Sequence, residues 1–139
     1  SVELALHSQA VWAIEHKAEA CELIRCNREK FCAWNLRVVE GHAPEVLKEL
    51  PAPDVVFLGG TGRKMPEILQ VVREKNPKAR VCISAIALET LHQAVEELTA
   101  LGHAPEITQI SVSRAKAAGD LHLLLAQNPI FLLSAGGEA

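Results

Sequence analysis

The residues that could carry chemistry stand at the ends of apolar runs. Glu15 directly follows the run 10–14, which has the length and composition of a buried strand. A carboxylate at the end of such a strand is well placed to accept hydrogen bonds from the two hydroxyls of a ribose. The alternative is a solvated glutamate in front of a helix, where the helix dipole favours an acidic residue in any protein. The sequence leaves both interpretations open.

A second candidate is the loop that follows the run 54–58, which is expected to be a strand buried on both faces. The loop is rich in small residues: Gly59, Gly60, Thr61 and Gly62. A helix is expected next, because apolar residues recur at helical spacing over 65–72 and Pro66 suits a first turn. Strand, loop and helix form the βα unit of a parallel sheet, whose ligands bind at the carboxyl ends of the strands. The alternative is a glycine-rich turn that binds nothing.

A third candidate follows the short strand expected over 36–39. Gly41, His42 and Ala43 lie between this strand and a short helix expected over 45–50. The first turn of a helix leaves backbone N–H groups without partners. A flat purine could therefore lie against the backbone at these three residues.

The order of the expected elements predicts an α/β fold. Strands are expected over 10–14, 36–39, 54–58 and 80–85, and they alternate with helices over 1–7, 17–33, 45–50, 65–75 and 88–101. The helix over 17–33 is expected to bury the face formed by Ala20, Leu23, Ile24, Asn27 and Phe31. Such alternation predicts a parallel sheet with helices on both faces.

The last third of the chain is expected to differ. A strand over 107–113 and a small, polar connection over 114–119 precede two apolar strands, 121–126 and 130–133. These two strands are expected to pair antiparallel at the sheet edge, because only a short segment joins them. A mostly parallel, Rossmann-like sheet that ends in an antiparallel hairpin is the layout of the class I S-adenosylmethionine methyltransferases.

Composition narrows the class of protein further. The chain has 139 residues, 49% of them hydrophobic and 22% charged, so one globular domain over 1–139 is expected. The net charge of −3, with no basic stripe, disfavours a nucleic-acid partner, and neither a signal peptide nor a membrane-spanning run is visible. The four cysteines form no C-x-x-C pair and the six histidines no H-E-x-x-H motif, so no metal is expected and a reducing cytoplasmic setting fits best.

Five short motifs occur in this order: Ala13-Ile14-Glu15, Val39-Glu40-Gly41, Gly59-Gly60-Thr61-Gly62, Leu88-Glu89-Thr90 and Gln127-Asn128-Pro129. Their order and spacing resemble the decarboxylating precorrin methyltransferases of cobalamin biosynthesis, the family that methylates carbon-15 of the corrin precursor. The resemblance covers almost the whole chain. The chain departs from the family at His42, where the family usually has Asp, and at Arg63, where it often has Gly. The family's first glycine motif would lie before Ser1, so the domain is expected to be truncated on its N-terminal side.

The resemblance implies a cofactor, a substrate and a reaction. The cofactor is S-adenosylmethionine, and the substrate is a precorrin-6 type tetrapyrrole that is methylated at carbon-15 and loses the carboxyl group of its ring C acetate. The cofactor-binding residues that it implies are Glu15 at the ribose, Gly41, His42 and Ala43 beside the adenine, and Gly59 under the sulfonium. The substrate-binding residues are Gly60, Thr61, Gly62, Ser84, Glu89 and Arg114, with a solvated loop residue as the alternative for Arg114. No paired carboxylates suggest acid–base catalysis, so catalysis is expected to come from holding the two reactants in line.

The resemblance also implies a homo-oligomer, a tetramer as in the family. The apolar residues of 121–125 and 130–133 are more than one sheet edge can hide, which supports assembly through these strands. A helix from an N-terminal segment could cover them instead. Two other functions stay open: a class I methyltransferase for another small molecule or an RNA base, and a non-catalytic assembly fragment.

Overall fold

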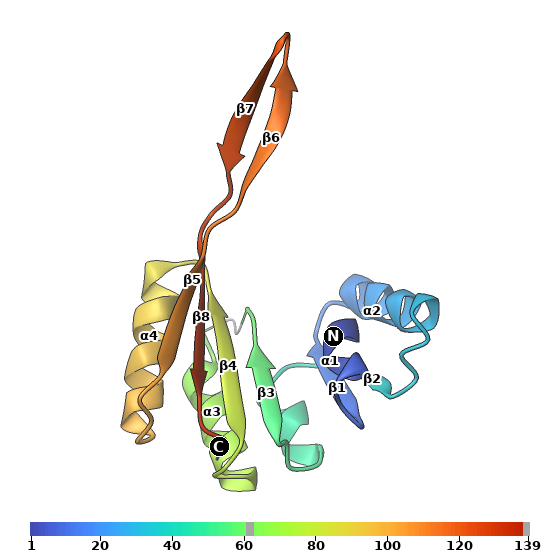
Figure 1. Ribbon diagram of the computed structural model, residues 1–139. Helices are drawn as coiled ribbons and strands as arrows, with labels where there is room; N and C mark the ends of the chain where they lie inside the picture. Colours follow the sequence, from blue (N-terminus) through green and yellow to red (C-terminus); the bar gives the residue numbers. More distant parts are fainter. Residues whose placement is uncertain (61–62, 138–139) are drawn as a thin grey trace. The chain divides into compact units, whose positions relative to one another are not determined.

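The computed structural model describes residues 1–60 and 63–137. The chain forms two compact units, Ser1–Pro51 and Ala52–Ala139 (Figure 1). Each unit pairs parallel strands and packs helices against them. No helix in the described part of the chain is long and apolar enough to cross a membrane.

The first unit contains a two-stranded parallel sheet. Its elements in chain order are α1 (Val2–Leu6), β1 (Val11–Glu15), α2 (Ala18–Lys30), β2 (Leu36–Glu40) and a short 3-10 helix, η1 (Val46–Glu49). The register pairs Val11 with Leu36 and Glu15 with Glu40, so both strands end at the same edge. A small core of Ala5, Ala33 and Leu36 joins α1 to the sheet.

Helix α2 buries only part of the predicted face. Ile24 is half-buried and packs against the small core, but Leu23 is 64% exposed and Phe31 is 56% exposed. Cys21, which was not predicted to face inward, is fully buried. The inner face is centred on Cys21 and continues through the half-buried Arg25 and Arg28, one and two turns later. The hydrophobic periodicity of α2 places its arginines in solvent. The aliphatic stem of an arginine can nevertheless cover apolar surface, and for this reason the periodicity did not predict the buried face correctly.

The second unit is built on a four-stranded sheet in the order β3-β4-β8-β5. Its elements are β3 (Val55–Leu58), α3 (Met65–Lys75), β4 (Arg80–Ala85), α4 (Leu88–Ala100), β5 (Glu106–Ile110) and β8 (Ile130–Ala135). Strands β3 and β4 are parallel, and β8 runs antiparallel to both β4 and β5. Strands β3, β4 and β5 therefore share one direction, with β8 reversed between β4 and β5.

The two C-terminal strands were predicted to pair with each other, and this prediction is wrong. Strand β7 (Leu121–Ala126) pairs with β6 (Ser113–Ala118), which occupies the predicted polar connection. A two-residue turn at Gly119 and Asp120 joins them, and Gly119 has φ +61°, as the first position of such a turn requires. Strand β8 enters the middle of the larger sheet because Leu133 becomes fully buried there.

Helices α3 and α4 cover one face of the larger sheet. Leu69 and Val72 of α3 and Leu98 of α4 are buried, and they line one small cavity together with Val81 of β4. The alternate side chains of β3 point to the other face, and Val55 and Phe57 are 61% and 50% exposed. The prediction that this strand is buried on both faces is therefore wrong within its own unit.

Candidate functional site

Glu15 is the last residue of β1, and its carboxylate folds back over the start of α2. Its Oε1 atom accepts hydrogen bonds from the backbone N–H groups of His16 (2.8 Å) and Lys17 (2.9 Å). The N–H of Lys17 is the strongest influence that holds the pKa of Glu15 below its ordinary value; the N–H of His16 and the charges of both neighbours act in the same direction, against partial burial. Glu15 is therefore ionised at neutral pH, and it occupies a helix N-terminus as the alternative interpretation expected.

The end of β2 lies beside Glu15. The N–H of Gly41 donates to the carbonyl oxygen of Glu15 over 2.9 Å, and this bond holds the two strand ends together. The rings of His16 and His42 stack with centroids 4.6 Å apart and planes 23° apart. The structure thus brings Glu15, Gly41 and His42 together at the carboxyl ends of two parallel strands, where ligands of open α/β sheets bind.

The backbone at Gly41 explains why this position is glycine. Its φ is +152°, and a Cβ atom built there would lie 2.5 Å from Cγ1 of Val46. The following loop is tied to η1 by a hydrogen bond from the N–H of Val46 to the carbonyl oxygen of His42, 3.1 Å long. His42 is exposed and Ala43 is half-buried, so both side chains border the loop surface that was predicted to meet a purine.

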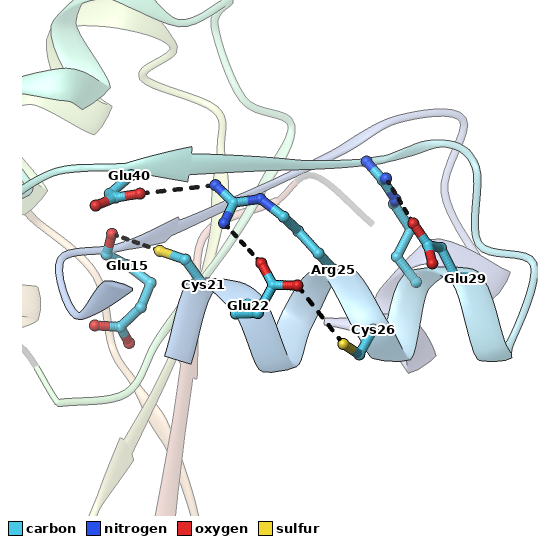
Figure 2. Close-up of polar contacts among 8 residues, drawn as sticks. Glu15, Cys21, Glu22, Arg25, Cys26, Glu29 and Glu40 are labelled. Carbon is cyan, nitrogen blue, oxygen red and sulfur yellow. Dashed lines mark hydrogen bonds and ion pairs between the residues drawn. The ribbon is translucent and has the colours of Figure 1, made fainter. Parts of the chain in front are cut away.

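Helix α2 is anchored to both strand ends by side chains that the sequence analysis did not single out (Figure 2). The thiol of Cys21 donates to the carbonyl oxygen of Glu15 over 3.3 Å. Arg25 pairs with Glu22 on its own helix at 3.3 Å and with Glu40 at the end of β2 at 3.7 Å. In Figure 2 the Glu15 carboxylate points away from Arg25 and Glu40, so it remains available on its own side of the strand end.

The other predicted residues belong to the second unit. Gly59 and Gly60 follow β3, and Ser84 lies on β4. Because Leu58 pairs with Ile83, the next residues, Gly59 and Ser84, lie side by side at the strand ends. A Cβ atom built at Gly59 or Gly60 would meet nothing within 4 Å, so this edge is open. Thr61 and Gly62 lie outside the described residues.

Glu89 and Arg114 are both exposed. Glu89 lies in the first turn of α4, immediately after the end of β4. Arg114 lies on β6 opposite Leu125, and not in the predicted connecting loop. Since β5 runs in the direction of β3 and β4, the hairpin that carries Arg114 begins at the edge of the sheet where those strands end.

The hairpin of β6 and β7 exposes the leucines of its second strand. It extends beyond the four-stranded sheet of its unit (Figure 1). Every residue of the two strands is exposed, and the large apolar ones are Leu121, Leu123, Leu124 and Leu125. Leu121, Leu123 and Leu125 share one face with Arg114 and Lys116, and Leu124 lies on the other face. Several exposed leucines on one short strand are typical of an interaction site.

In residues 1–60 and 63–137, no three His, Cys, Asp or Glu side chains are grouped so that they could hold a metal ion. The cysteines of this part of the chain are free. The candidate groups of the first unit are therefore a carboxylate, imidazoles and backbone groups, and those of the second unit include the open glycines.

Comparison with known proteins gives consistent matches across both units. A family model described as a precorrin methyltransferase domain matches residues 1–135. A protein from Pyrobaculum calidifontis, named "Probable cobalt-precorrin-6B C(15)-methyltransferase (decarboxylating)", is 39% identical over 139 residues, which cover 97% of this chain and 71% of that protein.

Solved structures agree with these matches. The crystal structure of a protein from Methanobacterium thermoautotrophicum, described as a precorrin 8W decarboxylase, has a TM-score of 0.89 at 33% identity and covers 97% of this chain and 74% of that one. A SAM-dependent O-methyltransferase from Thermotoga maritima has a TM-score of 0.67 at 13% identity, covering 94% of this chain and 51% of that one. The latter likeness concerns the fold alone, and it confirms the predicted class I methyltransferase fold.

Proposed function

This chain belongs to the precorrin methyltransferase family, and we propose that it methylates carbon-15 of a precorrin-6 type tetrapyrrole with loss of the ring C acetate carboxyl group, a step of cobalamin biosynthesis. The observation that carries this proposal is that Glu15 and His42 lie at the carboxyl ends of two paired parallel strands, where His16 contacts both. The family model matches residues 1–135 of the same chain. The names of its relatives support the same reaction. Because the family match spans both compact units, we propose that they belong to one methyltransferase domain.

The proposed cofactor is S-adenosylmethionine, which supplies an electrophilic methyl group. Its ribose suits Glu15, because the carboxylate is ionised and Oε2 has no partner among the described residues. Its adenine is proposed to lie against Gly41, His42 and Ala43, where the backbone is fixed by the bond from Gly41 to Glu15. Gly59 is proposed to lie under the sulfonium, and the open space above this glycine supports that role.

The proposed substrate residues lie at the strand ends of the second unit. Gly60 and Ser84 stand at an open edge, Thr61 and Gly62 continue the same loop in the sequence, and Glu89 follows the next strand. Arg114 presents an exposed guanidinium, whose fork can bind a substrate carboxylate with two hydrogen bonds. Arg114→Ala is expected to raise KM about tenfold, which corresponds to the loss of ~1.4 kcal/mol of binding.

These residues would act by positioning. Methyl transfer forms a carbon–carbon bond at carbon-15 and leaves the sulfur with the electron pair of the broken bond. The carboxylate then leaves as carbon dioxide, and its bonding pair enters the conjugated tetrapyrrole. The methylene group that remains would then take up a proton from solvent. The sequence shows no paired carboxylates for acid–base catalysis, so alignment of the sulfonium methyl with carbon-15 would make the main contribution to the rate.

The proposed protein is a cytoplasmic homotetramer. The free cysteines of the described part fit a reducing compartment. The exposed leucines of β7 support assembly, because a second copy would remove them from water.

The test is an assay of the full-length protein with methyl-labelled S-adenosylmethionine and a precorrin-6 type substrate. Label transfer and released carbon dioxide should rise together. Calorimetric titration of Glu15→Ala should show at least tenfold weaker cofactor binding, since each charged hydrogen bond contributes about 1.5–3 kcal/mol. Glu19→Ala, in the first turn of the same helix, is the matched control and should bind normally. Unchanged cofactor affinity in Glu15→Ala would remove Glu15 from the site.

A further inference from the structure

His16 contacts both groups that are proposed to hold the nucleoside part of the cofactor. Its backbone N–H lies 2.8 Å from Oε1 of Glu15, and its Nδ1 atom lies 3.2 Å from the same oxygen. Its ring stacks on the ring of His42 at 4.6 Å. One residue therefore connects a carboxylate at the end of β1 with an imidazole after the end of β2.

We propose that His16 is a positioning residue of the nucleoside site, which fixes the Glu15 carboxylate and the His42 ring in one arrangement. The proposal rests on the function proposed above, because it assigns Glu15 to the ribose and His42 to the adenine. His16 itself need not touch the cofactor. Its effect is to hold the two contacts before the ligand arrives.

The hydrogen bonds at Glu15 favour one orientation of the carboxylate. Oε1 accepts hydrogen bonds from the backbone N–H groups of His16 and Lys17, and the Nδ1 atom of His16 lies 3.2 Å from the same oxygen. A carboxylate oxygen has about two lone-pair sites, so the two backbone donors fill Oε1 and leave Oε2 as the acceptor for a ligand hydroxyl. The backbone donors fix the position of Oε1, and the ring of His16 closes the remaining side.

The ring stack restricts His42 in the same way. His42 is exposed, and its carbonyl oxygen is held by Val46. Among the described residues its side chain has no hydrogen bond, ion pair or ring contact other than the stack on His16. An exposed side chain without a neighbour would lose rotamer freedom when it meets the adenine. Stacking on His16 removes part of that freedom in advance, and pre-organisation of this kind strengthens binding.

Three substitutions separate the two contacts of His16. Asparagine places an amide nitrogen close to the position of Nδ1, so His16→Asn keeps a polar nitrogen beside Glu15 and loses the ring. His16→Phe keeps a ring for His42 and loses that nitrogen. His16→Ala loses both, and every variant retains the backbone N–H. His92→Ala is the matched control, because His92 also pairs with a glutamate, Glu96, at 3.3 Å, on the exposed side of α4.

The experiment is calorimetric titration of each full-length variant with S-adenosylmethionine. We expect about tenfold weaker binding for His16→Ala, intermediate values for His16→Asn and His16→Phe, and no change for His92→Ala. Unfolding by urea without cofactor should be the same for all four variants, because His16 is exposed. Partial rescue by both conservative variants at constant stability would distinguish positioning from a structural role.

A readout without cofactor completes the test. In the NMR spectrum, the ring protons of His42 should feel the ring current of a stacked neighbour in the native protein and in His16→Phe, and should lose it in His16→Ala. Native affinity in His16→Ala, or equal losses in all three His16 variants, would overturn the proposal while Glu15→Ala still tests the proposed function. A wild-type protein that did not bind the cofactor would instead overturn both.

Discussion

The Sγ atom of Cys21 donates a hydrogen bond to the carbonyl oxygen of Glu15 over 3.3 Å, joining the start of α2 to the end of β1. Cys21 is fully buried, and this burial raises the pKa of its thiol, with a smaller contribution in the same direction from the charge of Glu40. A thiol with a raised pKa stays protonated at neutral pH. It therefore remains a hydrogen-bond donor and is a poor nucleophile.

The cysteines should consequently differ in reactivity. Treatment of the native protein with iodoacetamide at pH 8 should modify the exposed Cys26 and Cys32 first. The half-buried Cys82, whose pKa is also raised by burial, should react more slowly, and Cys21 should react last. Peptide mass spectrometry over time measures the order, and all four should react at similar rates in denaturant. Fast modification of Cys21 in the folded protein would contradict its buried position.

Gly41→Ala should destabilise the first unit. The substitution forces an alanine to φ +152° and places its Cβ atom 2.5 Å from Cγ1 of Val46. Strain and overpacking together should lower the free energy of unfolding by about 1–3 kcal/mol. Urea denaturation measures the loss. Gly60→Ala is the control, because its Cβ atom would meet nothing within 4 Å and its φ is not positive.

A second variant separates the two causes at Gly41. Adding Val46→Ala to Gly41→Ala removes the clash but leaves the backbone strain, so it should restore only part of the stability after correction for Val46→Ala alone. A Gly41→Ala protein as stable as the wild type would show that the loop can move without cost.

Much of the fold could be predicted because local pattern decides it. The predicted helix over 65–75 and strand over 80–85 agree with Met65–Lys75 and Arg80–Ala85. The pairing of strands was less predictable. Leu123 and Leu133 lie in similar apolar runs, yet Leu123 is 52% exposed on a hairpin and Leu133 is fully buried in the larger sheet. That difference depends on contacts between residues far apart in the sequence, which no local pattern reports.

In the candidate site, too, the features set by local sequence pattern could be predicted and those set by packing could not. Glu15, His42 and Gly59 could be found because each lies at, or just after, the end of an apolar strand. His16 and Cys21 were not singled out, although their spacing from Glu15 is short. Their contacts with Glu15 depend on how α2 starts and packs against β1. Histidine and cysteine occur in many kinds of environment, so their residue types alone do not predict these contacts.

Glu15→Gln should change the pH dependence of stability. The pKa of Glu15 is lowered in the folded protein, so its ionised form stabilises the fold at a pH above the ordinary carboxyl pKa of about 4.3. This contribution should disappear as the pH falls from about 4.3 through the lower folded pKa. The wild type should therefore be more stable than Glu15→Gln at pH 7, by about 1 kcal/mol, and the difference should shrink as the pH falls below the ordinary carboxyl pKa.

The measurement is urea denaturation of both proteins at several pH values. Glu19→Gln controls for the loss of one negative charge in the first turn of α2. A difference between the wild type and Glu15→Gln that persisted undiminished at pH 3 would show that the ionised carboxylate is not its source.

Gly60→Val should separate cofactor binding from methyl transfer. Open space surrounds Gly60, so the valine side chain should fit without disturbing the fold. The same side chain would occupy the space proposed for the tetrapyrrole. We expect normal S-adenosylmethionine affinity by calorimetry and loss of label transfer in the methylation assay. Normal turnover by Gly60→Val would place the substrate elsewhere and would favour a smaller substrate.

Leu123→Lys should dissociate the proposed assembly. Leu121, Leu123 and Leu125 alternate along β7 and share one face of the hairpin. Lys116 of β6 lies opposite Leu123 on the same face. If a second copy covered this face, Leu123→Lys would place two like charges side by side in the contact, and the burial of unpaired charge costs several kcal/mol. Light scattering at micromolar concentration should therefore give a multimer for the wild type and a smaller species for Leu123→Lys.

Leu23→Lys provides the matched control, because Leu23 is a leucine on α2 with 64% exposure, outside the hairpin. It should leave the molar mass unchanged. A soluble wild-type monomer would contradict assembly through these strands. If a segment of the same protein covered the leucines instead, both the wild type and Leu123→Lys would be monomers. In that case Leu123→Lys would only lower the free energy of unfolding.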